Sequence, residues 1–238
     1  MPKINFLSQA DAKAIVPPTE EEIRALISGA EELRPVAPLF PEVIELLIEF
    51  GFRPAELFHL PWASVDWNLG EGDNRGAVRV EEQSKTIAGK TWTPKNKRYR
   101  TIPFTVRGRE ILERLRKLAG KAKPSDLVIP NTSGMPYTRL DDGEAKGGGS
   151  EVWRTLKQLS GVQASMRELR HAFAVANLMR GVPIPVVSQW MGHSKSDLTV
   201  KRYGRFAHEA REQWHWAALR ARPVEEVAQA PRKLVAVP

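Results

Sequence analysis

The stretch that decides the fold class of this chain is SMRELRHAFAVANLMRGVPIPVVSQWMGHSKSDLTVKRYGRF, residues 165–206. Apolar residues recur in it at helical spacing, and glycines interrupt the pattern at intervals. We therefore expect a series of short helices over 151–222, each ending near a glycine. The same stretch carries two arginines and a histidine, then a Gly-His pair, and then Tyr203.

The first half of the chain predicts further helices and one small sheet. Thr19 and Glu22 have the spacing of a capping box, which predicts a helix from there to about Leu33. Apolar and polar residues alternate within 77–103, which predicts a small antiparallel hairpin or three-stranded sheet. Further helices are expected at 41–50, from Pro54 and at 105–119, and a short strand at 126–130. The predicted fold class is mainly α with a small antiparallel β-sheet (α+β).

Length and composition fit one domain with short ends. With 238 residues and 42% hydrophobic content, the chain can bury one large core or two small ones. We expect an N-terminal arm or linker over 1–18, a domain over 19–222 and a C-terminal tail over 223–238. Residues 141–150, DDGEAKGGGS, predict a Gly-rich loop inside the domain.

The charge of the chain indicates an anionic partner. A net charge of +8 and a pI near 9.8 favour nucleic acid. Residues 85–109 hold eight Lys or Arg residues and no acid, which indicates a local binding face. The absence of cysteine excludes disulfides and thiolate metal sites. No long apolar run and no signal peptide are present, so we expect a cytoplasmic protein that does not enter a membrane.

Tyr203 is the candidate nucleophile. It is one of three tyrosines, and only this one follows a cluster of phosphate-seeking side chains. Phosphoryl transfer spreads negative charge over the non-bridging oxygens, so fixed cations stabilise its transition state. Arginine suits this role because it stays charged and its planar fork binds two oxygens. The pattern favours attack of a tyrosine hydroxyl on a DNA phosphodiester.

Five short boxes occur in the order and spacing of a known family. They are GFRPAEL (51–57), TPKNKRYRTIPF (93–104), RELRHAFA (167–174), MGHSKSDLT (191–199) and RYGRF (202–206). Together they resemble the signature boxes of the tyrosine recombinase, or phage integrase, family, and the resemblance spans about residues 19–210. It implies that family's catalytic-domain fold. It also implies cutting and rejoining of DNA through a covalent 3′-phosphotyrosine, with no metal, ATP or other cofactor.

The resemblance also implies a role for individual residues. Arg53 and Arg170 would be the two arginines that clamp the phosphate, and Tyr203 the nucleophile. His193 would hydrogen-bond the phosphate. In the family's His-x-x-Arg box the first position is usually histidine, which helps to handle the proton of the nucleophile; here it is Arg167. Arginine does not accept a proton at neutral pH, so Arg167 is expected to stabilise a tyrosinate or the phosphate by its charge.

His171 is expected to support the site rather than to act in it. It follows Arg170 directly, and helix geometry turns the two side chains about 100° apart. In the family this position is structural. The resemblance therefore leaves open which group accepts the proton of the nucleophile.

The basic stretch before residue 104 contains the candidate lysine. The family's sheet lysine protonates the departing 5′-oxygen and precedes an Arg-x-(Ile/Val)-Pro element, here residues 100–103. Counting back at the family's spacing gives Lys95, and Lys85 is the alternative. The remaining basic residues of this stretch, together with Lys85, are expected to bind the DNA backbone: Lys85, Lys90, Lys97, Arg98 and Arg100.

Several readings remain open at this point. The leading one is a site-specific recombinase or integrase that acts on double-stranded DNA recombination sites, with a phage, a mobile element or chromosome-dimer resolution as its context. We expect a monomer in solution, a tetramer on DNA and accessory DNA-bending proteins, and we expect the family's usual N-terminal core-binding domain to be absent. The alternatives are a type IB topoisomerase-like relaxing activity and a DNA-binding protein with impaired cleavage. The position of Arg167 favours the last of these.

Overall fold

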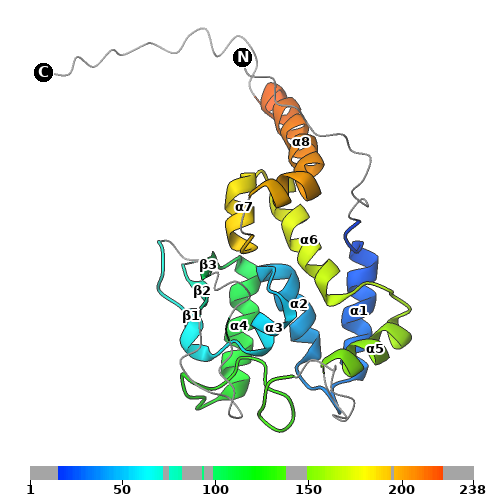
Figure 1. Ribbon diagram of the computed structural model, residues 1–238, viewed down its shortest axis with the longest axis vertical. Helices are drawn as coiled ribbons and strands as arrows, with labels where there is room; N and C mark the ends of the chain where they lie inside the picture. The colour runs from blue at the N-terminus through cyan, green and yellow to red at the C-terminus, as the bar shows by residue number, and fades with distance from the viewer. Residues whose placement is uncertain are drawn as a thin grey trace, which may run out of the picture.

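Helices form most of the structure, in agreement with the sequence (Figure 1). The computed structural model describes residues 16–71, 75–81, 93, 99–137, 149–193 and 196–221. Its helices are α1 (Glu20–Glu32), α2 (Phe40–Phe50), α3 (Pro54–Phe58), α4 (Val106–Ala119), α5 (Gly149–Ser160), α6 (Met166–Met179), α7 (Ile184–Trp190) and α8 (Ser196–Ala221), and a 3-10 turn, η1, covers Trp62–Ser64.

Side-chain caps fix where two of these helices begin. The predicted capping box opens α1: Thr19 N donates to Glu22 Oε2 at 2.8 Å, and Glu22 N donates to Thr19 Oγ1 at 3.2 Å. The same reciprocal bonds between Ser165 and Glu168, at 2.6 and 3.3 Å, open α6. A fixed first turn sets which residues of α6 face the core.

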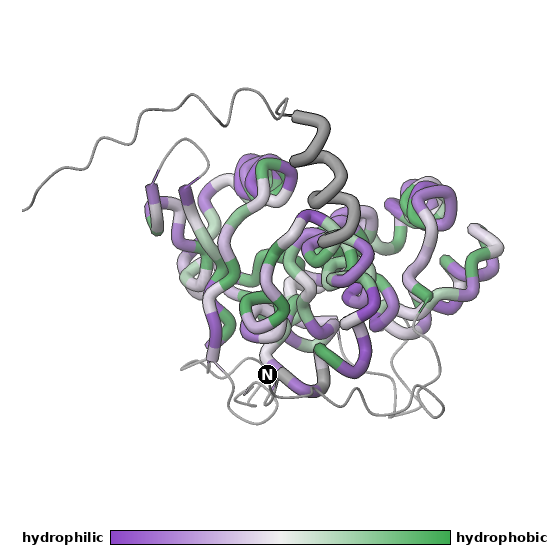
Figure 2. Tube along the Cα trace, turned by 90° about the horizontal axis from the view of Figure 1, so that it is seen from above, coloured by the Kyte–Doolittle hydropathy of each residue, from purple (hydrophilic) through white to green (hydrophobic). Residues whose placement is uncertain are grey.

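The core is built around α2, which packs against α1, α4 and α6. Its apolar residues are fully buried: Phe40, Val43, Ile44, Leu46, Leu47 and Phe50. Figure 2 shows apolar segments of several elements meeting near the middle of the molecule. Burial of this size is the main stabilising term of the fold.

The sheet has three antiparallel strands in the order β1 (Val65–Asp66), β2 (Ala77–Val80) and β3 (Arg100–Pro103). Val78 pairs with Val65 on one side and with Ile102 on the other. The small antiparallel sheet is confirmed, and β2 and β3 lie within the predicted range 77–103, but the third strand, β1, comes from residues before it. β3 also contacts α7, which brings the sheet next to the C-terminal helices.

Two local expectations differ from the structure. The prediction of a strand at 126–130 is wrong, because this segment forms only an isolated bridge between Pro61 and Leu127. Its neighbour there is an irregular segment that turns at once into η1, so a ladder has no room to extend. The Gly-rich loop expected at 141–150 ends earlier than predicted, since α5 begins at Gly149, and its other residues lie outside the described ones.

Candidate active site

Arg53 is placed by a sharp turn between α2 and α3. Gly51 ends α2 in the left-handed region, with φ of 59°, and Pro54 occupies the first turn of α3. The Arg53 guanidinium donates to Glu56 Oε1 at 2.7 Å and to the Gly192 carbonyl oxygen at 3.1 Å. Arg53 therefore joins α3 to the turn between α7 and α8.

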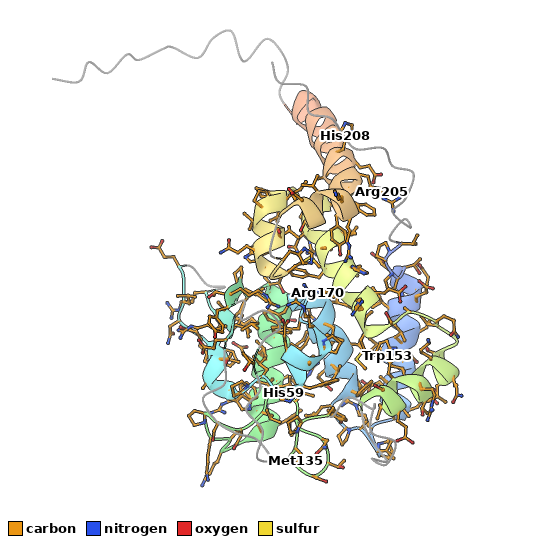
Figure 3. The ribbon with its side chains drawn as sticks, in the orientation of Figure 1. His59, Met135, Trp153, Arg170, Arg205 and His208 are labelled. Carbon is orange, nitrogen blue, oxygen red and sulfur yellow. The ribbon has the colours of Figure 1, made fainter. Side chains whose placement is uncertain are left out.

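Arg170 reaches the same turn from α6. Its side chain is buried and donates to the carbonyl oxygens of Gly51 and Met191. Burial, together with the neighbouring charge of Arg53, lowers the pKa of Arg170 to about 9. The guanidinium is still charged at pH 7. Figure 3 shows Arg170 where α6, α7 and the top of α2 come together.

A buried carboxylate, Glu56, balances part of this charge. Arg100 donates to both of its oxygens, at 3.0 and 2.6 Å, and both side chains are 1% exposed. Burial alone would raise the pKa of Glu56, but the hydrogen bonds and charge of Arg100, with the charges of Arg170 and Arg53, lower it to about 2. Glu56 is therefore ionised; it pairs with Arg100 and Arg53, and its charge also interacts with Arg170.

His193 stands directly after the Gly192 turn. Its Nδ1 lies 2.7 Å from Thr199 Oγ1 in α8, and Thr199 is fully buried. Burial and the neighbouring arginines, Arg170 and Arg53 first among them, lower the pKa of His193 to about 4. The imidazole is therefore neutral at pH 7, and its position at the arginine cluster suits a hydrogen bond to a phosphate oxygen.

Tyr203 lies in the first half of α8 with its side chain fully buried. Its hydroxyl makes a hydrogen bond with His171 Nδ1, and the two ring centroids are 5.7 Å apart. Burial raises the pKa of the Tyr203 hydroxyl, while the charges of Arg170 and Arg202 act to lower it. The candidate nucleophile thus lies within the field of the arginine cluster.

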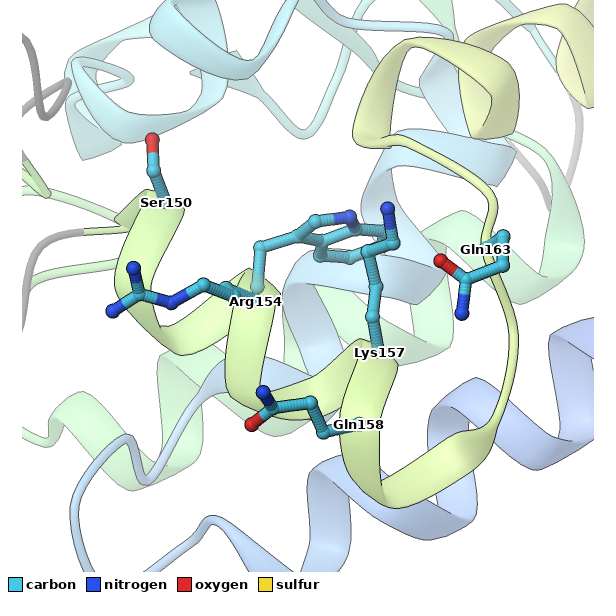
Figure 4. Close-up of a pocket in the computed structure, with 6 residues that line it drawn as sticks. Ser150, Arg154, Lys157, Gln158 and Gln163 are labelled. Carbon is cyan, nitrogen blue, oxygen red and sulfur yellow. The ribbon is translucent and has the colours of Figure 1, made fainter.

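A second surface feature lies away from the arginine cluster. A surface hollow lies between α5 and the segment that follows it, lined by Trp153, Lys157 and Gln163 among others, and it does not include the arginine cluster (Figure 4). Among the described residues, no group of three or more His, Asp or Glu side chains is placed to hold a metal ion. None of the described helices is long and apolar enough to cross a bilayer.

The family model described as "Phage integrase family" matches residues 19–210. This range includes the arginine cluster, His193 and Tyr203. The chain belongs to the phage integrase family. The match spans most of the chain, contains all five boxes, and has the limits expected for the resemblance, about residues 19–210.

Curated relatives of this integrase-family chain are tyrosine recombinases. It is 25% identical over 187 residues to the tyrosine recombinase XerD of Xanthomonas campestris pv. campestris, covering 76% of this chain and 52% of the relative. It is 26% identical over 207 residues to XerC of Staphylococcus saprophyticus, covering 86% of this chain and 60% of the relative. The chain therefore spans about half the length of the curated relatives it matches.

Solved structures confirm the fold. The Tn1549 transposon integrase in complex with transposon right end DNA has 21% identity and a TM-score of 0.60, and the match covers 87% of this chain and 67% of that one. The catalytic domain of bacteriophage HP1 integrase has 19% identity and a TM-score of 0.54, covering 92% and 100%. The predicted tyrosine recombinase catalytic-domain fold is confirmed.

The structure brings together four of the predicted site residues of this integrase-family chain, with His171 in contact with one of them. Arg53, Arg170 and His193 meet at the turn of residues 191–193, and Tyr203 lies within reach of the charge of Arg170. Arg167 is exposed on the first turn of α6. The sites predicted within 82–98 lie outside the described residues: Lys85, Lys90, Lys95, Lys97 and Arg98.

The structure corrects the expected role of Arg100. We expected it to bind the DNA backbone, but its side chain is 1% exposed and is held by Glu56 and by the Trp190 carbonyl oxygen, 2.6 Å from its Nε. Alternation along β3 explains this, because Arg100 and Ile102 point to the buried side of the strand while Thr101 and Pro103 are exposed. A buried, fully paired guanidinium is not available to DNA.

Sequence reasoning missed two groups that the structure places in the site. Glu56 is buried among the arginines, and it stands three residues after Arg53 in GFRPAEL, so an ion pair at helical spacing was a usable signal. Arg202 is exposed, and its charge acts on His171, His193 and Tyr203. Tyr203 is its neighbour in the chain, but only the folded arrangement of α6, α7 and α8 brings the two histidines near it.

Proposed function

We propose that this chain is a DNA strand transferase of the tyrosine recombinase type. It cuts and rejoins DNA through a covalent 3′-phosphotyrosine at Tyr203 and acts as a site-specific recombinase or integrase. The observation that carries the proposal is the convergence of Arg53 and Arg170 on one turn that also positions His193, beside the buried Tyr203. Membership of the phage integrase family supports it.

The charge of the site suits a phosphodiester. Among the described residues of the cluster, Arg53, Arg100 and Arg170 face one carboxylate, Glu56, so two positive charges remain uncompensated. A phosphodiester carries one negative charge, and its five-coordinate transition state carries about one more on the non-bridging oxygens. The surplus therefore stabilises the transition state more than the bound substrate.

The remaining parts of the reaction are assigned to groups that the structure does not describe. Lys95 protonates the departing 5′-oxygen, with Lys85 as the alternative, and the other basic residues of this stretch follow the DNA backbone: Lys85, Lys90, Lys97 and Arg98. The chain binds double-stranded recombination sites and assembles as a tetramer on them. The transposon integrase and XerH neighbours were solved with DNA, which supports a DNA partner here.

The buried nucleophile adds one requirement. Tyr203 is fully covered, so its hydroxyl does not meet a phosphate in this arrangement. Binding of DNA must shift the start of α8 before attack. The same burial, with Arg167 in place of the usual histidine, is what favours the alternative of a DNA-binding protein with impaired cleavage.

Covalent trapping tests the proposal. A pool of duplexes with random sequence around a nick is incubated with the protein, and adducts are recovered on a denaturing gel. Arg170→Ala should lower adduct formation at least about 100-fold, because one transition-state clamp is lost. It should leave DNA binding nearly intact, since binding uses many phosphate contacts. Arg180→Ala, which removes an exposed arginine at the end of the same helix, is the matched control. Equal adduct yields from the two variants would contradict the assignment.

A further inference from the structure

The hydroxyl of Tyr203 has one described hydrogen-bond partner, and it is His171, the histidine that was expected from the sequence only to support the site. His171 Nδ1 bonds Tyr203 Oη across the packed faces of α6 and α8. The imidazole of His171 is half-buried, and the tyrosine ring is fully buried beside it. The two atoms that would exchange the proton are already in contact in this arrangement, and the contact must persist when DNA binding shifts the start of α8.

Helix geometry explains how His171 can replace the missing histidine. Residues four apart on a helix share one face, so His171 lies one turn beyond Arg167 on the same side of α6. Arg170, between them, points instead into the buried cluster. The imidazole of His171 therefore faces Tyr203 in α8 from one turn farther along α6 than residue 167.

We propose that His171 is the catalytic proton acceptor for Tyr203. As Tyr203 Oη forms its bond to phosphorus, the hydroxyl proton passes to His171 Nδ1, and the bond from phosphorus to the 5′-oxygen breaks. The 5′-oxygen takes a proton from a separate acid, assigned above to Lys95. This step rests on the proposed function, and it requires the His171 tautomer that carries its hydrogen on Nε2.

The charges around His171 support the neutral, accepting form of the ring. Burial lowers its pKa to about 4, and Arg202, Arg170 and Arg167 act in the same direction while Glu168 opposes them. The ring is thus neutral at pH 7. A phosphodiester that binds to the arginine cluster cancels part of this positive field, so DNA binding makes His171 a stronger base at the moment it is needed.

Two variants separate proton transfer from positioning. His171→Gln keeps a polar side chain that can hold the tyrosine hydroxyl but cannot take its proton, and His171→Ala removes both. Both variants should form the adduct about 10²–10⁴-fold more slowly than the unaltered protein, the usual contribution of a general base. His208→Gln, an exposed histidine farther along α8, should leave the rate unchanged. A His171→Gln rate within threefold of the unaltered protein would overturn the proposal.

A more acidic nucleophile, which depends less on a general base, gives the second readout. Fluorotyrosine is introduced at position 203 alone, and its phenol loses a proton more readily than that of tyrosine. In this background the fall in the rate of adduct formation caused by His171→Ala should be at least tenfold smaller. A structural role of His171 would leave that fall unchanged, which would contradict the proposal. The unaltered protein distinguishes the two levels: no adduct from it overturns the proposed function and this inference together, but an adduct that is unaffected by His171→Ala overturns this inference alone.

Discussion

Glu56→Gln is the substitution whose effect the structure predicts most closely. The change keeps the size of the side chain and removes its charge. Arg100 then remains buried, with its Nη groups facing a neutral amide in place of a carboxylate. Arg53 also loses its 2.7 Å partner. An uncompensated charge in the interior is among the most destabilising changes a single substitution can make.

The magnitude follows from the pKa of the carboxyl. Its pKa falls from 4.5 to about 2 on folding. This lowering of the pKa corresponds to roughly 3–4 kcal/mol of stabilisation, at about 1.4 kcal/mol for each tenfold change in the ionisation constant. This agrees with the roughly 3–5 kcal/mol lost when one partner of a buried ion pair is removed. Glu56→Gln should therefore lower the free energy of unfolding by about 3 kcal/mol at pH 7.

The pH dependence provides an internal check. Because folding lowers the pKa of Glu56, its contribution is complete above pH 4.5 and is lost as the pH falls toward 2. The difference in stability between the unaltered protein and Glu56→Gln should therefore be constant from pH 7 to about pH 5.5 and should shrink below it. Urea denaturation followed by circular dichroism at a series of pH values measures both quantities.

An exposed pair supplies the control. Glu113 is 52% exposed and pairs with Arg109 four residues before it on α4, so Glu113→Gln should change stability by less than about 0.5 kcal/mol. The reasoning is refuted if Glu56→Gln costs less than about 1 kcal/mol at pH 7, below the range of buried ion pairs. It is equally refuted if the cost does not decline in acid.

Three further predictions concern the turn, the nucleophile and the leaving group. Gly192→Ala should lower stability by about 1–2 kcal/mol and slow adduct formation, because φ there is 60° and the carbonyl that holds Arg53 would move; a normal melting curve would contradict this. Without DNA, tetranitromethane should nitrate Tyr99, which is 52% exposed, and spare Tyr203, which is fully buried. Mass analysis of peptides measures both, and equal nitration would contradict the burial of Tyr203. A DNA substrate with a 5′-bridging sulfur has a leaving group that needs no proton, so it should restore cleavage by Lys95→Ala but not by Arg170→Ala. If it restores cleavage by Lys85→Ala instead, Lys85 and not Lys95 is the acid that protonates the 5′-oxygen.

The sequence was enough to predict the fold because local signals agreed with the global pattern. The capping box at Thr19 and the glycines after α5, α6 and α7 marked real helix boundaries. Gly161, Gly181 and Gly192 all have positive φ, as expected of residues that end helices. The strand at 126–130 failed because β-propensity does not specify a partner, and the segment lies beside an irregular one.

The site was only partly predictable from the sequence. Residue types favoured Tyr203 as the nucleophile, and the resemblance to the tyrosine recombinase family implied the roles of Arg53, Arg170 and His193. The structure groups these last three at one turn. The burial of Arg100 depends on the register of β3 against β2, which the composition of a basic stretch does not reveal. The contact of His171 depends on how α8 packs on α6, a long-range feature that helix periodicity alone could not supply.

The most direct test of the account is whether Tyr203 becomes attached to DNA. A nicked duplex selected from the random pool is incubated with the unaltered protein and with Tyr203→Phe, and the products are separated on a denaturing gel. The account predicts a covalent adduct with the unaltered protein and none with Tyr203→Phe, although both bind the duplex. An adduct that persists in Tyr203→Phe, or DNA binding by the unaltered protein without any adduct, would contradict it.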